Sequence, residues 1–240
     1  MTASEDSTRS QPAGLSPAVA RLLPWSARVH VFDVDHTLVR RSTGRRFAQA
    51  LVRSGHLKHW DLLTLPWHYL RYRLGTINAG ELSGRLALIQ GLSEAALQDA
   101  ARSAHDRYGI KDVFHQARRY VELLHDQERP IVLASTSVRV ALEPLAHELG
   151  IQHLLGSELE FHRGNATGRL VGEPCYGPHK VARVGALLNE LGFTFADAAF
   201  YSDSIHDRFL LSAVGYPVAV RPDARLRSLA QSYGWPVVWW

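Results

Sequence analysis

The chain of 240 residues contains one cysteine, Cys175, and no uninterrupted run of 18 apolar residues. A single cysteine excludes an internal disulfide bond and favours a reducing compartment, so we expect the protein in the cytoplasm. The absence of a long apolar run predicts that no helix spans a membrane. Glu5 and Asp6, with no apolar segment beside them, argue against a secretory signal sequence.

An excess of charge of one sign is also missing, because 23 acidic residues are interleaved with 27 basic ones for a net charge of +4. With a pI of about 9.4, this balance gives no reason to expect nucleic-acid binding and suits a small anionic substrate equally well. A hydrophobic fraction of 46% is typical of a globular protein. A chain of this length accommodates one domain with an insertion or two small domains.

The first 24 residues have no hydrophobic periodicity and predict a disordered tail. Beyond them, short apolar runs with β propensity predict strands at Val29–Phe32, 131–134, 198–201, 217–220 and 236–240. Helical periodicity over 138–149 and 179–191 separates several of these strands. The alternation predicts an α/β fold with a Rossmann-like parallel sheet core.

Two segments interrupt the alternation. Residues 44–125 show helical periodicity without a convincing strand and are far more than one crossover needs, which predicts an inserted helical cap. Residues 158–161 and 166–171 flank a polar turn and predict a small β-hairpin. The α/β core is therefore expected to comprise residues 25–43 and 126–240.

The most informative feature is the pair Asp33 and Asp35 at the end of the first predicted strand. Positions i and i+2 of a strand lie on one face, so the two carboxylates repel each other unless a cation or a shared proton compensates. Open α/β sheets bind ligands at the carboxyl ends of their strands. There the pair is suited to framing a divalent metal and one nucleophilic oxygen.

Two further segments carry candidate phosphate ligands. Ser135, Thr136 and Ser137 follow the second predicted strand, and they suit either a helix N-cap or a phosphate cradle built with the free N–H groups of a helix start. Lys180 lies near the start of the helix predicted at 179–191, where the helix dipole disfavours a cation. It is either a solvated surface lysine or a lysine that faces an anion.

Asp203 and Asp207 follow the strand predicted at 198–201. Their spacing lets both side chains face one site if a helix begins between them, and an Asx-turn with a helix cap is the structural alternative. Mg²⁺ prefers oxygen ligands, commonly one or two carboxylates. These acids are therefore candidate ligands of the cation that Asp33 and Asp35 require.

In chain order, a DxDxT pattern, a hydrophobic strand ending in serine, a lysine and a strand ending in DxxxD resemble the haloacid dehalogenase (HAD) superfamily. The resemblance covers about residues 29–240. The long helical insertion, the hairpin ending at 167–170 and the segment 172–175 resemble its phosphoserine-phosphatase-like branch, subfamily IB. The resemblance implies a Mg²⁺-dependent phosphatase that hydrolyses a small phosphorylated metabolite.

The same resemblance implies a role for each motif residue. Asp33 is expected to be the nucleophile that forms an aspartyl-phosphate, and Asp35 to protonate the leaving alcohol and then activate water. Thr37 is expected to support the loop that carries them. Ser135 is expected to hydrogen-bond the phosphoryl oxygens, and Lys180 to neutralise the charge of Asp33 and the phosphate.

The resemblance also implies a metal site. Mg²⁺ is expected to bind Asp33, the backbone carbonyl of Asp35 and Asp203, with Asp207 holding the site directly or through another ligand. The metal and Lys180 together allow an anionic nucleophile to approach an anionic phosphate.

Asp35 favours a phosphatase over a dehalogenase of the same superfamily, because a halide leaving group needs no proton. Two other activities stay open on the sequence. One is a phosphotransferase or mutase that passes the phosphoryl group to another acceptor, and the other is a non-catalytic binding protein with the same fold. No feature of the sequence predicts an oligomeric state.

Phosphoserine phosphatases carry a substrate-binding carboxylate shortly after the DxDxT pattern, and the corresponding residue here is Ser42, within an arginine-rich segment. This departure argues against phosphoserine and favours a substrate with an additional anionic or hydroxyl group. His36 stands where the family more often has a small residue and is a candidate substrate contact. The aromatic and basic segment 60–74 predicts cap packing or a dimer contact, with an apolar substrate pocket or a membrane-surface contact as alternatives.

Overall fold

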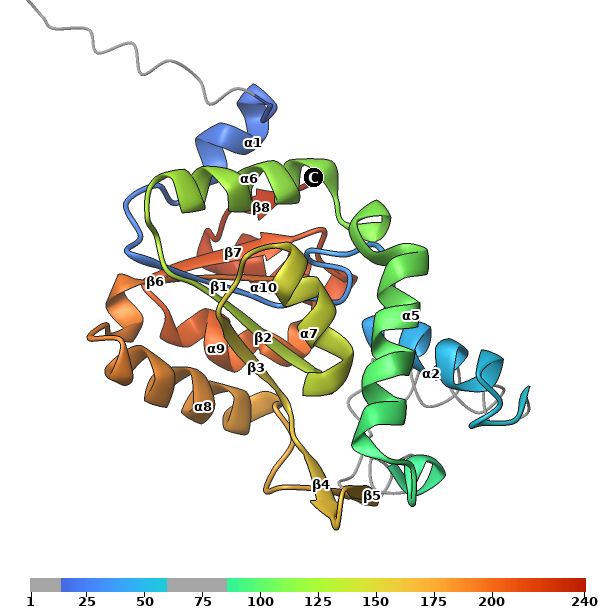
Figure 1. Ribbon diagram of the computed structural model, residues 1–240. Coiled ribbons are helices and arrows are strands. Elements are labelled where there is room, and N and C mark those ends of the chain that lie inside the picture. Colours follow the sequence, from blue (N-terminus) through green and yellow to red (C-terminus); the bar gives the residue numbers. More distant parts are fainter. Residues whose placement is uncertain (1–13, 60–85) are drawn as a thin grey trace, which may run out of the picture.

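The computed structural model describes residues 14–59 and 86–240. Their centre is a six-stranded sheet with the order β3-β2-β1-β6-β7-β8, in which all neighbouring strands are parallel (Figure 1). The strands are β1 Val29–Phe32, β2 Ile131–Val138, β3 His153–Ser157, β6 Ala198–Ser202, β7 Tyr216–Val220 and β8 Val237–Val238. The prediction of an α/β fold with a parallel sheet core is confirmed.

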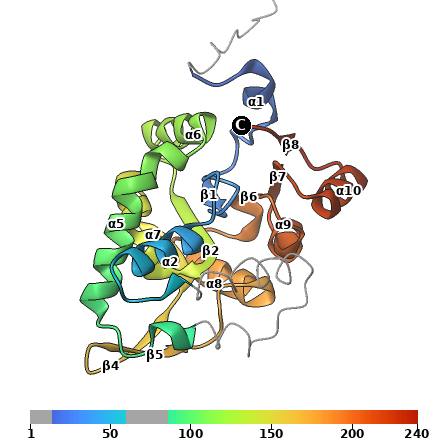
Figure 2. The same cartoon turned by 90° about the vertical axis from the view of Figure 1, so that its right-hand side faces the viewer.

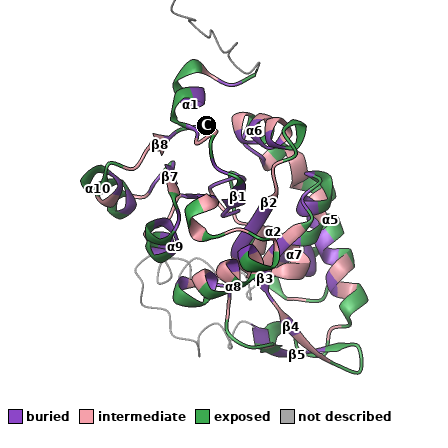
Figure 3. Ribbon diagram, turned by 90° about the vertical axis from the view of Figure 1, so that its left-hand side faces the viewer, coloured by how far each residue is buried: buried purple, intermediate pink, exposed green. Residues whose placement is uncertain are grey.

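Strand β1 lies in the middle of the sheet and is buried along its whole length (Figure 3). Val29 and Val31 pack into the hydrophobic core on one face, and Phe32 packs into the core on the other. A parallel sheet that is covered on both faces requires such continuously apolar strands. Phe32 pairs with Leu133 of β2 and Tyr201 of β6, so the chain leaves these three strands along the same edge of the sheet.

Helices cover both faces of the sheet (Figures 1 and 2). The face of Phe32 is covered by α1 Pro17–Leu22, α6 His115–Asp126 and α7 Arg139–Glu148. The face of Val31 is covered by α8 Gly177–Glu190, α9 Arg208–Ala213 and α10 Ala224–Tyr233. Two short 3₁₀ helices, η3 Phe195–Asp197 and η4 Ile205–Asp207, flank β6.

The insertion and the hairpin share a third hydrophobic cluster, separate from those on the two faces of the sheet. It is built by α2 Thr43–Arg53, η2 Ala87–Ile89, α5 Glu94–Asp112, β4 Leu159–His162 and β5 Asn165–Leu170. Ala166 of the hairpin donates its N–H to the Leu92 carbonyl and accepts from the Gly91 N–H, both at 2.8 Å. The hairpin therefore packs on the helical insertion, as both ribbon views show (Figures 1 and 2).

Two of the predicted domain boundaries are wrong. Residues 17–22, placed in the disordered tail, form α1, because Val19 and Leu23 bury against the core. Helix α6, placed in the cap, covers the sheet instead, with Tyr120 and Leu124 fully buried in the sheet core. Hydrophobic periodicity identifies an apolar helix face without showing which surface it covers.

The sequence also missed β3, and it ended β2 four residues early. Residues 1–13 of the predicted tail and the aromatic segment 60–74 lie outside the described residues. Within the described part of the chain, no helix is long and apolar enough to cross a membrane.

Candidate active site

The carboxyl ends of β1 and β6 meet where the order of the strands changes direction. From β1 the chain builds β2 and β3 on one side, and β6, β7 and β8 follow on the other. Open α/β sheets bind ligands in the crevice outside such a switch point. Asp33 directly follows β1 and Asp203 directly follows β6, so the fold brings these two predicted residues to either side of the switch point.

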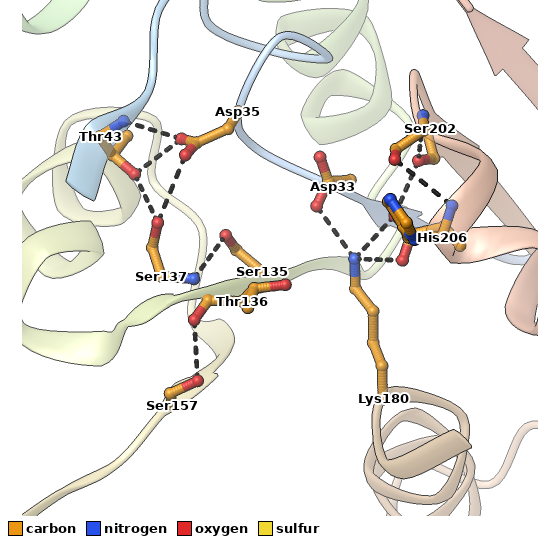
Figure 4. A network of polar contacts seen from close by, with 12 residues as sticks. Asp33, Asp35, Thr43, Ser135, Thr136, Ser137, Ser157, Lys180, Ser202 and His206 are labelled. Carbon is orange, nitrogen blue, oxygen red and sulfur yellow. Dashed lines mark hydrogen bonds and ion pairs between the residues drawn. The ribbon is translucent and has the colours of Figure 1, made fainter. Parts of the chain in front are cut away.

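Lys180, in the first turn of α8, joins two of the acidic residues. Its side chain is 1% exposed, and its Nζ lies 2.9 Å from Oδ1 of Asp33 and 2.9 Å from both carboxylate oxygens of Asp207 (Figure 4). Asp207 also accepts a hydrogen bond of 2.7 Å from the Oγ of Ser202, which is fully buried at the end of β6. Lys180 is therefore a lysine that faces anions, and the alternative of a solvated surface lysine is wrong.

Burial governs the charge of the carboxyl groups at this edge. It raises the pKa of Asp33, while the Lys180 ammonium lowers that pKa and the Asp207 carboxylate raises it. Burial also raises the pKa of Asp203 well above its usual range, and repulsion from Asp33 and Asp207 adds to this effect. Further positive charge is needed if these groups are to be ionised together at neutral pH.

The oxygen donors at the switch point fit Mg²⁺. This ion commonly uses one or two carboxylates together with water and substrate oxygens. Asp33 and Asp203 supply two carboxylates whose mutual repulsion a cation relieves, and the backbone carbonyl of Asp35 is the third predicted protein oxygen. No three His, Cys, Asp or Glu side chains between 14 and 59 or 86 and 240 converge into a ready-made metal cluster. A site that substrate and water complete does not require one.

The Asp35 carboxylate points away from Lys180, toward Thr43 and Ser137 (Figure 4). Its Oδ1 accepts hydrogen bonds from the Thr43 N–H at 2.8 Å and the Thr43 hydroxyl at 2.7 Å, and its Oδ2 accepts from the Ser137 hydroxyl at 3.4 Å. Thr43 is the first residue of α2, and Ser137 lies near the end of β2. Sequence reasoning assigned neither residue to Asp35, because no spacing rule links the start of α2 to the end of β2.

Ser135 lies at the switch-point edge with 2% of its surface exposed, and its Oγ accepts from the Ser137 N–H at 3.2 Å. Strand β2 continues to Val138, which precedes α7 and makes no side-chain capping bond. The alternative that these hydroxyls cap the helix is therefore wrong. Thr136 accepts a hydrogen bond of 2.8 Å on its carbonyl from the Ser157 hydroxyl, which ties the end of β2 to β3.

The loop after Asp35 is held by residues that are distant in sequence. Thr37 is fully buried, and its carbonyl accepts a hydrogen bond of 2.8 Å from the Trp240 indole N–H. His36, which has a left-handed φ of 65°, makes a 3.2 Å contact between its Nδ1 and the Arg40 carbonyl. Sequence reasoning did not identify Trp240 as a neighbour of this loop, because the two segments are 203 residues apart.

The fold and the site together define an α/β enzyme with acidic side chains and a buried lysine at the carboxyl edge of a parallel sheet. Residues 30–212 match the family model described as haloacid dehalogenase-like hydrolase. The chain belongs to this family, and its relatives place it in the phosphoserine-phosphatase-like branch. The predicted family and the predicted hydrolase class are thereby confirmed.

Two curated relatives cover most of the chain. Phosphoserine phosphatase SerB1 of Mycobacterium tuberculosis is 33% identical over 211 residues, which are 86% of this chain and 68% of the relative. A histidinol-phosphatase of Neisseria meningitidis is 30% identical over 216 residues, which are 87% of this chain and 96% of the relative. Among solved structures, a protein of unknown function from Bordetella pertussis aligns with a TM-score of 0.79 at 29% identity, covering 89% of this chain and 98% of that protein.

Proposed function

We propose that the protein is a Mg²⁺-dependent phosphatase that hydrolyses a small phosphomonoester through an aspartyl-phosphate on Asp33. One observation carries the proposal. The Lys180 ammonium is fully buried, and Asp207 fixes it 2.9 Å from the Asp33 carboxylate at the switch point of the sheet. A buried cation held beside a strand-end carboxylate offsets the charge that builds up when this carboxylate attacks a phosphate.

In the first proposed step, a carboxylate oxygen of Asp33 attacks phosphorus and the bond between phosphorus and the alcohol oxygen breaks. Asp35 gives its proton to the departing alkoxide, so the alcohol leaves neutral. In the second step, a water molecule attacks phosphorus while Asp35 takes one of its protons, and the bond between phosphorus and Asp33 breaks. Inorganic phosphate leaves and both aspartates return to their initial state.

Asp33, Asp203 and the Asp35 carbonyl are the residues that we propose hold Mg²⁺. A bound Mg²⁺ would supply positive charge to the phosphoryl oxygens and keep the neighbouring carboxyls ionised. Ser135 is proposed to donate its hydroxyl proton to a phosphoryl oxygen. Ser135 lies in β2 two residues after Leu133, which pairs with Phe32 of β1, and this position near Asp33 in the sheet supports the role.

The start of α2 bears on the alcohol half of the substrate. The Ser42 hydroxyl accepts a hydrogen bond of 3.3 Å from the Arg45 N–H and caps the helix, and the first turn contains no acidic residue. Arg41 and Arg45 are exposed beside it. This basic helix start offers no counter-ion to a substrate ammonium, so we propose a phosphomonoester with an additional anionic or hydroxyl group, and phosphoserine is disfavoured.

A screen of phosphorylated metabolites and p-nitrophenyl phosphate, with Mg²⁺ or with EDTA, tests the proposed function. We expect phosphate release with Mg²⁺ and its loss in EDTA. Asp33→Asn should lower the rate by on the order of a thousandfold or more. Asp126→Asn, which alters an exposed aspartate at the end of α6, is the matched control and should behave like the wild type.

Two outcomes contradict the proposal. If the wild type releases no phosphate from any ester, including p-nitrophenyl phosphate, the protein is not a phosphatase. If added alcohols receive most of the phosphoryl group in place of water, the enzyme is a phosphotransferase that uses the same nucleophile.

A further inference from the structure

The acid-base residue of the proposed reaction, Asp35, is held by a pair of hydroxyl side chains from two different parts of the fold. The Thr43 N–H and hydroxyl donate to Oδ1 at 2.8 and 2.7 Å, and the Ser137 hydroxyl lies 3.4 Å from Oδ2. The two hydroxyl oxygens are themselves 3.0 Å apart. Asp35, Thr43 and Ser137 thus form one closed network (Figure 4).

We propose that Thr43 and Ser137 are positioning residues that fix the Asp35 carboxyl group for proton transfer to the leaving alcohol. We call these two residues the hydroxyl clamp. The inference rests on the proposed function, because it concerns the orientation of the acid in that reaction. It assigns a role toward Asp35 to two residues that the sequence did not link to this aspartate.

The local structure of α2 does not require the Thr43 hydroxyl. The helix is already capped by the neighbouring Ser42, whose Oγ accepts from the Arg45 N–H at 3.3 Å. The Thr43 hydroxyl is directed at Asp35, from a helix of the insertion to a residue of the core loop. The bond from the Thr43 hydroxyl to Asp35 is therefore separate from the cap of the helix.

The clamp also distinguishes the two oxygens of Asp35. Oδ1 accepts two short hydrogen bonds from Thr43, while Oδ2 accepts the longer bond of 3.4 Å from Ser137. An oxygen that already accepts two short bonds is a poor position for a further proton. The geometry therefore leaves Oδ2 as the oxygen that exchanges the proton with the leaving alcohol and then with water.

The clamp spans the junction between core and insertion. Thr43 is the first residue of α2, and Ser137 is in the last part of β2. The two elements are in contact here, because a Cβ added at Gly44 would lie 3.5 Å from the Ser137 hydroxyl, an ordinary van der Waals distance. The position of α2 relative to β2 therefore sets the orientation of Asp35 through two side chains.

Leaving-group dependence separates this positioning role from a structural one. An alkyl phosphate needs a proton on its leaving oxygen, whereas p-nitrophenolate leaves as a stable anion. The variants are Thr43→Val, which is isosteric and keeps the backbone N–H bond, and Ser137→Ala. Thr43→Ser restores the hydroxyl, and Ser93→Ala, which removes the exposed N-cap serine of α5 in the same insertion, is the matched control. Stopped-flow measurements give the first-turnover release of p-nitrophenolate, and steady-state assays give kcat and KM for the best alkyl phosphate of the screen.

We expect Thr43→Val to lower kcat for the alkyl phosphate by about tenfold or more, as the loss of part of an acid-base contribution. KM and the first-turnover rate with p-nitrophenyl phosphate should stay within about twofold of the wild type, since neither depends on the acid. Ser137→Ala should have the same selectivity with a smaller effect, because its contact is longer. Thr43→Ser should recover most of the rate, and Ser93→Ala should leave the ratio between the two substrates unchanged.

The clamp is refuted if Thr43→Val slows both substrates equally, if it slows neither, or if Ser93→Ala reproduces its selectivity. Thermal unfolding of each variant identifies a loss of folded protein, which lowers both rates together and so also counts against the clamp. An active wild type with an unselective Thr43→Val variant refutes the clamp alone. An inactive wild type refutes the proposed function and the clamp with it.

Discussion

Replacing Lys180 by methionine removes the ammonium that bridges the carboxylates of Asp33 and Asp207. The three side chains are 1%, 11% and 8% exposed, and the bridging distances are 2.9 Å. Methionine keeps most of the aliphatic volume, so the perturbation is mainly electrostatic. The variant holds two buried acidic groups without the cation between them, although Ser202 still donates to Asp207.

The expected loss of stability is large for one substitution. Removing one partner of a buried ion pair costs about 3 to 5 kcal/mol of unfolding free energy, because the remaining charge is left uncompensated. For a domain of this size, 1 kcal/mol corresponds to about 2 to 4 °C in Tm. The Lys180→Met variant should therefore melt about 10 °C below the wild type at neutral pH.

The loss of unfolding free energy in Lys180→Met should increase with pH. Without Lys180, burial and mutual repulsion raise the pKa of at least one of the two carboxyls in the folded variant. The folded state then binds a proton that the unfolded chain has released above a pKa of about 3.9. Because the folded state binds more protons, the unfolding free energy falls as the pH rises through the raised pKa. The variant should be closest to the wild type near pH 5 and weakest near pH 8.

Urea unfolding of both proteins at pH 5 and pH 8, in EDTA so that no metal replaces the lysine, measures this difference. Lys111→Met, which removes an exposed lysine at the end of α5, is the matched control and should change the unfolding free energy by less than about 0.5 kcal/mol. An equal loss at both pH values, or a loss as small as that of the control, would refute the assignment of Lys180 as the counter-ion of both aspartates.

Two further predictions concern the buried residues His30 and Trp240. Burial lowers the pKa of His30 to about 3, so the unfolded state binds the extra proton between about pH 3 and 6.5 and stability falls as the pH drops through this range. Between these pH values, His30→Gln should reduce the pH slope of the unfolding free energy by up to about 1.4 kcal/mol per pH unit. An unchanged slope would contradict the lowered pKa of His30. Trp240→Phe removes the 2.8 Å bond to the buried Thr37 carbonyl and should cost about 1 to 3 kcal/mol in urea unfolding. The control Trp239→Phe alters a half-exposed ring, and an equal cost for both variants would show that the bond to Thr37 contributes nothing.

The place of the candidate site could be predicted from the sequence because the carboxyl ends of parallel strands lie along one edge of the sheet. Asp33 and Asp203 each follow an apolar strand, and an α/β alternation requires those strand ends to share an edge. Lys180 was found by its position at a helix start, where a cation has no local reason to be. Position alone left structural alternatives open for Lys180 and Asp203, and the resemblance of the motif order to the HAD superfamily favoured the functional ones.

The parts that the sequence missed depend on packing between elements. The contacts of Thr43 and Ser137 with Asp35 arise because α2 lies against the end of β2. The misplacement of α6 has the same origin, since its apolar face fits the sheet or a cap equally well until Tyr120 is seen among the core residues. Strand β3 was missed because it is a short edge strand whose Gly156 interrupts the apolar pattern.

Ser42 shows how a structural role and a substrate preference can be separated at one position. Its hydroxyl caps α2, which explains why a short polar side chain is present. Aspartate caps a helix as well as serine does, and its negative charge favours a helix N-terminus. The fold would therefore accept a carboxylate at this position, beside the exposed Arg41 and Arg45. Because helix capping accepts either residue, the serine at this position supports the proposal that the substrate has no ammonium group near α2.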